Sequence, residues 1–130
     1  MISKFRLETE FQTDEGCHIL EMHNRKEDAN CSIVRARVMP GVTTQVHALQ
    51  GTEERYVILQ GEGRVEVGDA APALVRPLDV VTIPAGVRQR ITNIGTADLI
   101  FLCVCTPRFR VQNYRNLEAP RGGADAILPP

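Results

Sequence analysis

A histidine and a glutamate form the pair in this chain whose spacing best suits chemistry. His47 and Glu54 lie in the stretch PGVTTQVHALQGTEERYVILQG, which covers residues 40–61. An imidazole nitrogen and a carboxylate oxygen are ligands that Zn, Fe, Mn and Ni accept, and the same two groups can move protons. The pair therefore predicts either a metal site or a polar binding site in which His47 hydrogen-bonds to Glu54.

Two strands must bring these side chains together. The expected strand 42–49 places Thr43, Gln45, His47 and Leu49 on one face, and the expected strand 53–60 does the same for Glu54, Tyr56, Ile58 and Gln60. If the two faces meet inside a small barrel, His47 and Glu54 converge and Tyr56 lies beside them. Tyr56 could then orient a carbonyl or hydroxyl group, or could simply fill the barrel.

The rest of the sequence favours short strands over helices. No segment of about 12 or more residues shows a clear helical period, whereas strand-like segments recur at roughly 8–12-residue spacing. These segments cover residues 5–11, 17–24, 32–39, 42–49, 53–60, 64–67, 74–76, 79–83, 87–93 and 98–106. The pattern predicts an all-β fold.

Residues 41–61 resemble the first sequence motif of the cupin family. That motif runs Gly, five residues, His, one residue, His, three or four residues, Glu, six residues, Gly, and the spacings fit Gly41, His47, Glu54 and Gly61. The segment LDVVTIPAGVRQRITN, residues 78–93, resembles the second motif, with Gln89 at the position of its histidine. The resemblance covers residues 32–106 and implies a double-stranded β-helix, or jelly-roll, barrel.

The resemblance also implies a metal site with an altered ligand set. Metal-dependent cupins hold the ion with three histidines and one glutamate, but Leu49 and Gln89 occupy two of the histidine positions here. The implied ligands are His47, Glu54 and Gln89, of which Gln89 offers only a neutral amide oxygen. Such a site needs water or substrate oxygens to complete the shell of a divalent Zn, Fe, Mn or Ni ion.

The chain divides into three expected regions. Residues 1–31 are expected to form N-terminal strands that pack on the barrel or on a dimer partner, residues 32–106 the barrel, and residues 107–130 a C-terminal segment with a loose tail. The amphipathic strand 5–11 lies outside the motif-bearing barrel, and the edges of such sheets need cover. Together these features predict a homodimer.

Charge and composition argue against several classes of partner. The chain has 15 basic and 16 acidic residues, a net charge of -1, and no basic block, which disfavours nucleic acid and anionic membranes as partners. No apolar run approaches the roughly 20 residues that span a bilayer, and the N-terminus lacks the apolar core of a signal peptide. The four cysteines form no CxxC pair, so we expect reduced thiols in a cytoplasmic protein.

The leading functional hypothesis is a small cupin with a polar cavity that binds a divalent metal and a small oxygen-rich ligand, such as a sugar derivative, dicarbonyl or carboxylate. If it is catalytic, the metal would act as a Lewis acid while Glu54 or Tyr56 moves a proton, in isomerase, lyase or dioxygenase chemistry. The alternatives are a metal-free binding or sensing module and a metal-free sugar-nucleotide epimerase with His47 as base and Tyr56 as acid. The sequence leaves the choice between enzyme and binding module open.

Overall fold

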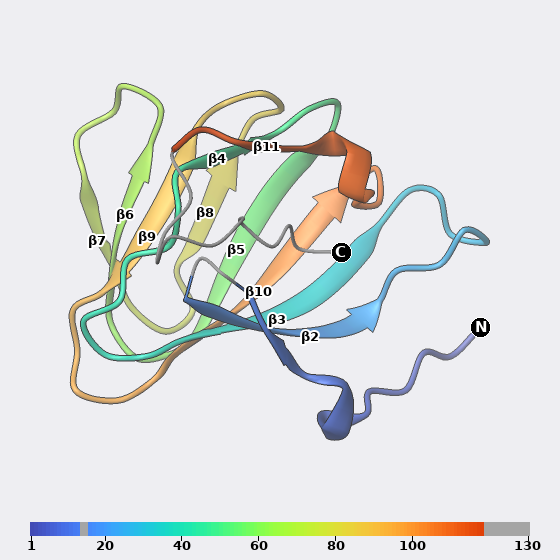
Figure 1. The fold of residues 1–130 in the computed structure, drawn as a ribbon, viewed down its shortest axis with the longest axis horizontal. Coiled ribbons are helices and arrows are strands. Elements are labelled where there is room, and N and C mark those ends of the chain that lie inside the picture. Colours follow the sequence, from blue (N-terminus) through green and yellow to red (C-terminus); the bar gives the residue numbers. More distant parts are fainter. Residues whose placement is uncertain (14–15, 119–130) are drawn as a thin grey trace.

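Two antiparallel β-sheets face each other in a computed structural model of the chain (Figure 1), which describes residues 1–13 and 16–118. One sheet has the strand order β1-β2-β3-β10-β5-β8 and the other β11-β4-β9-β6-β7. The strands are β1 (Phe11–Gln12), β2 (Cys17–His23), β3 (Ser32–Val38), β4 (His47–Leu49), β5 (Glu53–Gln60), β6 (Gly63–Val67), β7 (Ala73–Val75), β8 (Val80–Ile83), β9 (Gln89–Asn93), β10 (Leu99–Thr106) and β11 (Tyr114–Asn116). The all-β prediction is confirmed. Within the described residues, no helix is long and apolar enough to cross a membrane.

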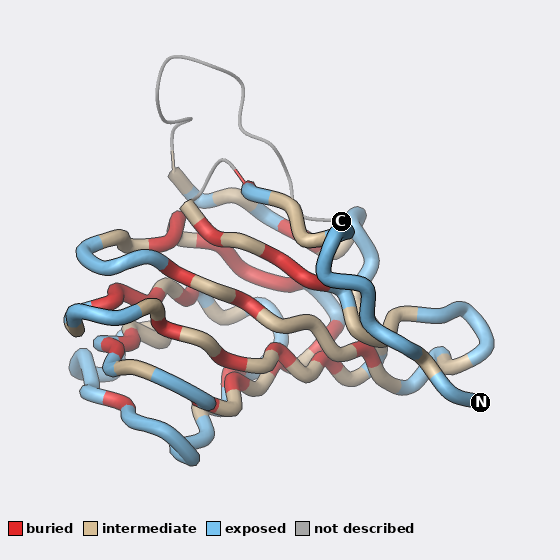
Figure 2. The backbone as a smooth tube through the Cα atoms, turned by 90° about the horizontal axis from the view of Figure 1, so that it is seen from below, coloured by how far each residue is buried: buried red, intermediate tan, exposed pale blue. Residues whose placement is uncertain are grey.

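Strict alternation along the central strands builds the core between the sheets. Along β10 every second residue is buried, beginning at Leu99, and β5 buries Glu54, Tyr56 and Ile58 in the same rhythm. Figure 2 shows that the buried residues lie along the strands, whereas the connecting loops are largely exposed. Because each fully buried aliphatic side chain contributes about 1.5–3 kcal/mol, this alternation fixes the register that also aims Glu54 and Tyr56 inward.

The tight link between β5 and β6 explains why the motif closes on a glycine. Gly61 has a φ of 87°, in the left-handed region that side chains disfavour. A Cβ atom at Gly61 would lie 2.9 Å from the carbonyl oxygen of Asp98 and 3.0 Å from Cα of Leu99. The turn therefore requires glycine for its backbone conformation and for its close approach to the start of β10.

The predicted strand at residues 5–11 is wrong, whereas the next predicted strand is present as β2. Residues 5–11 were expected to form one strand, but the structure has a short 3-10 helix, η1 (Leu7–Thr9), followed by the two-residue strand β1. The hydroxyl of Thr9 donates to the carbonyl of Arg6 at 2.6 Å, which closes this turn locally. Phe5 and Leu7 are exposed, and Figure 2 shows most of the N-terminal stretch in the colour of exposed residues. The homodimer stays a prediction.

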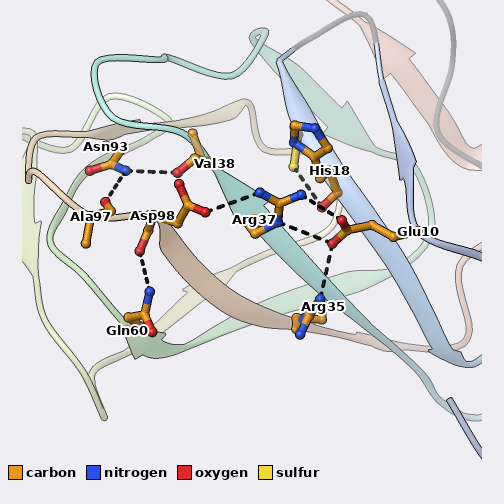
Figure 3. A network of polar contacts seen from close by, with 10 residues as sticks. Glu10, His18, Arg35, Arg37, Val38, Gln60, Asn93, Ala97 and Asp98 are labelled. Atoms are coloured by element: carbon orange, nitrogen blue, oxygen red, sulfur yellow. Dashed lines mark hydrogen bonds and ion pairs between the residues drawn. The ribbon is translucent and has the colours of Figure 1, made fainter. Parts of the chain in front are cut away.

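An ion-pair network on the outer face of β3 ties separate elements together (Figure 3). Arg37 contacts Glu10 at 2.7 Å and Asp98 at 3.2 Å, while Arg35 contacts the second oxygen of Glu10 at 3.1 Å. The hydrogen bond from Arg37 holds the pKa of the Glu10 carboxyl below its usual value, despite partial burial. The N-terminal stretch is thus anchored to β3, and β3 to the start of β10.

The C-terminal segment belongs to the sheet that carries His47. After η2 (Val111–Asn113), strand β11 pairs with β4, so that Tyr114 lies opposite Leu49 and Asn116 opposite His47. Figure 1 shows β4 and β11 side by side at one end of the molecule. The sequence predicted a C-terminal segment from residue 107 onward but no strand in it. The predicted loose tail from residue 119 onward lies outside the described residues.

Candidate functional site

A cavity of about 70 Å³ lies between the sheets at the end formed by β4, β5, β10 and β11. Its wall is mainly apolar, and its polar groups come from a few positions on facing strands. The lining residues are Cys17, Ile19, Ser32, Val34, Ala36, Thr44, His47, Leu49, Glu54, Tyr56, Phe101, Cys103, Cys105, Phe109 and Tyr114. An apolar pocket with a few convergent polar groups is the usual form of a small-molecule site.

His47 is held in one orientation and one tautomer. Its Nδ1 lies 2.8 Å from the backbone carbonyl oxygen of Gln45, and because a carbonyl only accepts, Nδ1 must donate. The imidazole ring also stacks on Tyr114, with ring centroids 5.3 Å apart and planes 19° apart. Nε2 is therefore the nitrogen that a neutral His47 offers to a ligand as a hydrogen-bond acceptor or a base.

Glu54 lies on the same cavity as His47, as the strand alternation predicted. It is 7% exposed, whereas the side chain of its neighbour Glu53 turns outward and pairs with Arg55. The thiol of Cys105 donates to Oε2 of Glu54 at 3.8 Å. Burial and the nearby Glu54 carboxylate raise the pKa of both the Cys105 and Cys103 thiols, so these side chains stay protonated donors beside the carboxylate.

Tyr56 and Gln89 are joined across the two sheets. The Tyr56 hydroxyl on β5 donates to the amide oxygen Oε1 of Gln89 on β9, and Tyr56 also packs on Phe101 with centroids 4.6 Å apart. Gln89 is 1% exposed and lies opposite His47 in the β4–β9 register, yet it is not among the described residues that line the cavity. Its Nε2 has no hydrogen-bond partner among the described residues.

The three predicted metal ligands, His47, Glu54 and Gln89, are not all available to one ion. Two of them, His47 and Glu54, line one cavity, but the oxygen of Gln89 already accepts a hydrogen bond from Tyr56. Leu49 adds only an apolar wall. Across residues 1–13 and 16–118, no group of three or more His, Cys, Asp or Glu side chains is arranged to hold an ion. A set of two strong donors does not fit a tightly held resident metal, which normally has at least three protein ligands.

The first strand of the site differs from the prediction. Only residues 47–49 form β4; before them, residues 41–44 pair irregularly with β9, through the isolated bridge between Thr43 and Thr92 and a few backbone hydrogen bonds. The backbone N–H of Thr44 donates to the carbonyl of Ile91 at 2.9 Å, while the N–H of Ile91 donates to the Thr44 hydroxyl at 3.0 Å, so the side chain takes part in the pairing. The alternation is therefore broken before His47, and Thr44 lines the cavity in the place that was expected for Gln45.

Sequence reasoning missed the part of the site that follows β10. Phe109 and Tyr114 both line the cavity, and with Leu49 and Cys105 they form a second small apolar cluster. The backbone N–H of Phe109 donates to the Ser32 hydroxyl at 2.8 Å, which seats the segment on β3. Two aromatic residues in an otherwise polar segment were the available signal, since such side chains contribute much buried area.

Comparison with known proteins identifies the family. A model of the cupin domain matches residues 34–105, and the chain belongs to the cupin family. An uncharacterized protein from Methanocaldococcus jannaschii is 31% identical over 108 residues, which are 82% of this chain and 86% of that protein. The resemblance inferred from residues 41–61 and 78–93 is confirmed.

Solved structures show the same fold at low identity. Pac13, a nucleoside dehydratase from Streptomyces, matches with a TM-score of 0.74 and 18% identity over 90% of this chain and 92% of its own. The formate complex of Lactobacillus farciminis oxalate decarboxylase matches with a TM-score of 0.73 and 23% identity over 84% of this chain and 33% of its own. Staphylococcus aureus CapF, a capsular polysaccharide assembling protein, matches with a TM-score of 0.71 and 20% identity over 85% and 34%. This chain therefore spans about a third of the latter two proteins.

Proposed function

We propose that this cupin binds a small oxygen-rich molecule in the cavity and that His47 and Glu54 exchange protons with it without a tightly held metal. The observation that carries this proposal is the hydrogen bond from His47 Nδ1 to the carbonyl of Gln45, because it leaves Nε2 as the base. Glu54 supplies a second proton-transfer group on the same cavity. Thiols at Cys103 and Cys105 supply weak donors at that wall.

The division of roles follows from what each group already contacts. His47 Nε2 would accept a proton from a carbon or hydroxyl group next to a carbonyl of the ligand. The Tyr56 hydroxyl proton is engaged by Gln89, which favours a positioning role for Tyr56 over that of an acid. The reaction class supported best is proton transfer within a sugar derivative, dicarbonyl or carboxylate, as in isomerases and lyases.

One structural relative suggests a class of ligand to include in the test. Pac13 is a nucleoside dehydratase. Structures with uridine exist for one variant in which a histidine is replaced and for two variants in which a tyrosine is replaced. At 18% identity this likeness shows the fold alone. It does make a hydroxylated sugar a sensible member of the ligand panel.

A solvent-exchange experiment tests the proposal. The protein is incubated in D2O with panels of hydroxy-aldehydes, dicarbonyls and hydroxy acids, and proton NMR follows deuterium entering carbons next to a carbonyl. We expect exchange with the wild type, and a loss of at least about 100-fold with H47Q, which matches the usual contribution of a general base. Binding detected by thermal shift without exchange would instead identify a binding or sensing module.

The metal content of the same preparation distinguishes the metal-free proposal from the metal-dependent hypothesis. The protein is purified without chelators or affinity nickel and its transition metals are measured by elemental analysis. The proposal expects less than about one tenth of an equivalent, because two donors hold divalent ions weakly. A full equivalent of metal that is lost in H47A would overturn the metal-free site and support the His47, Glu54 and Gln89 metal centre.

A further inference from the structure

A surface groove of about 450 Å³ adjoins the wall of the cavity. Its lining includes Arg108 and Arg110 from the segment after β10, together with Asn24 and Glu21 from the region of β2. Phe109 lines both the groove and the cavity, so the two spaces adjoin at this residue. A ligand in the cavity therefore lies close to the groove at Phe109.

The segment that carries the two arginines is fixed by backbone contacts. The N–H of Arg108 donates to the carbonyl of Ala29 at 3.1 Å, and the carbonyl of Phe109 accepts from Asn24 Nδ2 at 3.0 Å. Nη1 of Arg108 donates to Oδ1 of the same Asn24 at 2.9 Å. The position of the Arg108 guanidinium is therefore defined by the fold.

Among residues 1–13 and 16–118, no carboxylate pairs with the guanidinium groups of the groove. In the described part of the chain, neither Arg108 nor Arg110 forms an ion pair, whereas Arg35, Arg37 and Arg90 each contact a carboxylate. The buried Nε of Arg108 has no hydrogen-bond acceptor among the described residues. Glu21, the one acidic residue in the groove lining, accepts a hydrogen bond from Nδ2 of Asn24 at 3.5 Å and forms no ion pair with a described residue.

We propose that this groove binds the oxyanion, a phosphate or carboxylate, of the small molecule whose polar head occupies the cavity. Two guanidiniums against one carboxylate give the groove a net positive charge, and guanidinium groups recognise oxyanions with short, charge-assisted hydrogen bonds. The sequence from Pro107 to Leu117 contains no acidic residue that could compete with the ligand. The claim that the same molecule also occupies the cavity rests on the proposed function; anion binding in the groove does not.

The test uses inorganic phosphate and acetate as separate probes of the groove. Each is titrated into 15N-labelled protein, and backbone amide shifts of residues 108–112 are followed. We expect saturable shifts with at least one probe, and the stronger response shows whether phosphate or carboxylate is preferred. Loss of one charge-assisted contact in R110A should weaken binding about 3- to 10-fold.

The control is another exposed arginine that forms no ion pair with a described residue, Arg76. R76A removes the same charge away from the groove and should change the affinity by less than about twofold if specific contacts matter more than net charge. Equal weakening by R76A and R110A, or no saturable shift at residues 108–112 with either probe, would overturn the proposal. R108A is a second variant, and R110A keeps the test valid if R108A fails to fold.

The two proposals fail in different ways. Saturable shifts at residues 108–112 together with no proton exchange in the cavity would support the groove and reject the acid–base function. Proton exchange without any anion binding would support the acid–base function and reject the groove as an anion site. Anion-bearing members of the D2O panel should bind more tightly than neutral analogues only if the groove and the cavity serve one ligand.

Discussion

The hydroxyl of Tyr56 on β5 donates a hydrogen bond to the amide oxygen of Gln89 on β9, joining the two sheets through a buried contact. Gln89 stands where metal-dependent cupins place a histidine, and here its oxygen is used within the protein. The contact makes Gln89 part of the support of the site, with His47 as its neighbour across the β4–β9 pair.

The Tyr56–Gln89 contact should contribute measurably to stability. Y56F leaves the Gln89 oxygen without its donor, and a buried polar group left unpaired costs about 1–3 kcal/mol. Urea denaturation should show a loss of that size in the free energy of unfolding. The double variant Y56F/Q89L should lose less than the sum of the single variants, by about 1 kcal/mol. If the losses of the two single variants simply add in the double variant, the two side chains do not interact and the contact is contradicted.

Restoring a histidine at residue 49 should create a metal site. Leu49 lines the same cavity as His47 and Glu54, so L49H would supply a third strong ligand. We expect the affinity for Co2+ or Zn2+ to rise at least about 10-fold over the wild type. Binding is measured from the visible spectrum of Co2+ or by calorimetry. The variant H47A/L49H should return to the wild-type level. A wild-type protein that binds as tightly as L49H would show that Leu49 does not limit binding.

Glu10 should make the stability of the fold depend on pH. Arg37 and then Arg35 lower the pKa of Glu10 from its ordinary value of 4.5, so the folded state favours the ionised form. This contribution is fully present above about pH 4.5 and is lost as the pH falls through the lowered pKa of the folded state. E10Q should therefore be less stable than the wild type near pH 7, by about 1 kcal/mol, and the difference should shrink in acid.

The measurement is urea denaturation of both proteins at neutral and acidic pH. Glu8 is a matched control, because it pairs with Arg6 at an exposed site where both side chains are more than half exposed. E8Q should change the free energy of unfolding by less than about 0.5 kcal/mol at either pH. A constant difference between E10Q and wild type across pH would contradict the role of the ion pairs.

Two glycines with similar backbone conformations should respond differently to alanine. Gly61 and Gly86 have φ values of 87° and 78°, so both variants carry a backbone cost of about 1 kcal/mol. Only at Gly61 would the new Cβ meet backbone atoms, at 2.9 and 3.0 Å, whereas nothing lies within 4 Å at Gly86. Thermal unfolding should show G61A to be less stable than G86A by about 2 kcal/mol or more. Equal losses in the free energy of unfolding would show that the backbone near Asp98 moves to accommodate the new Cβ atom at residue 61.

Strand alternation could be read from the sequence wherever a strand is long and half-buried. The inward placement of Glu54 and Tyr56 follows from the pattern of β5, and the structure has that strand with the predicted bounds. The same rule failed before His47, because the Thr44 side chain takes part in an irregular pairing with Ile91. It also failed at residues 5–11, where a local turn replaced the strand and left Phe5 exposed.

The sequence by itself determined the cupin fold, the inward positions of His47 and Glu54, and the apolar residue at Leu49, because these depend on local spacing and period. Tertiary structure alone decided that Tyr56 donates a hydrogen bond to Gln89, that Tyr114 stacks on His47, and that Phe109 lines both the cavity and the groove of Arg108 and Arg110. Those contacts join residues far apart in the chain, and no local pattern of alternation specifies which distant side chains will meet.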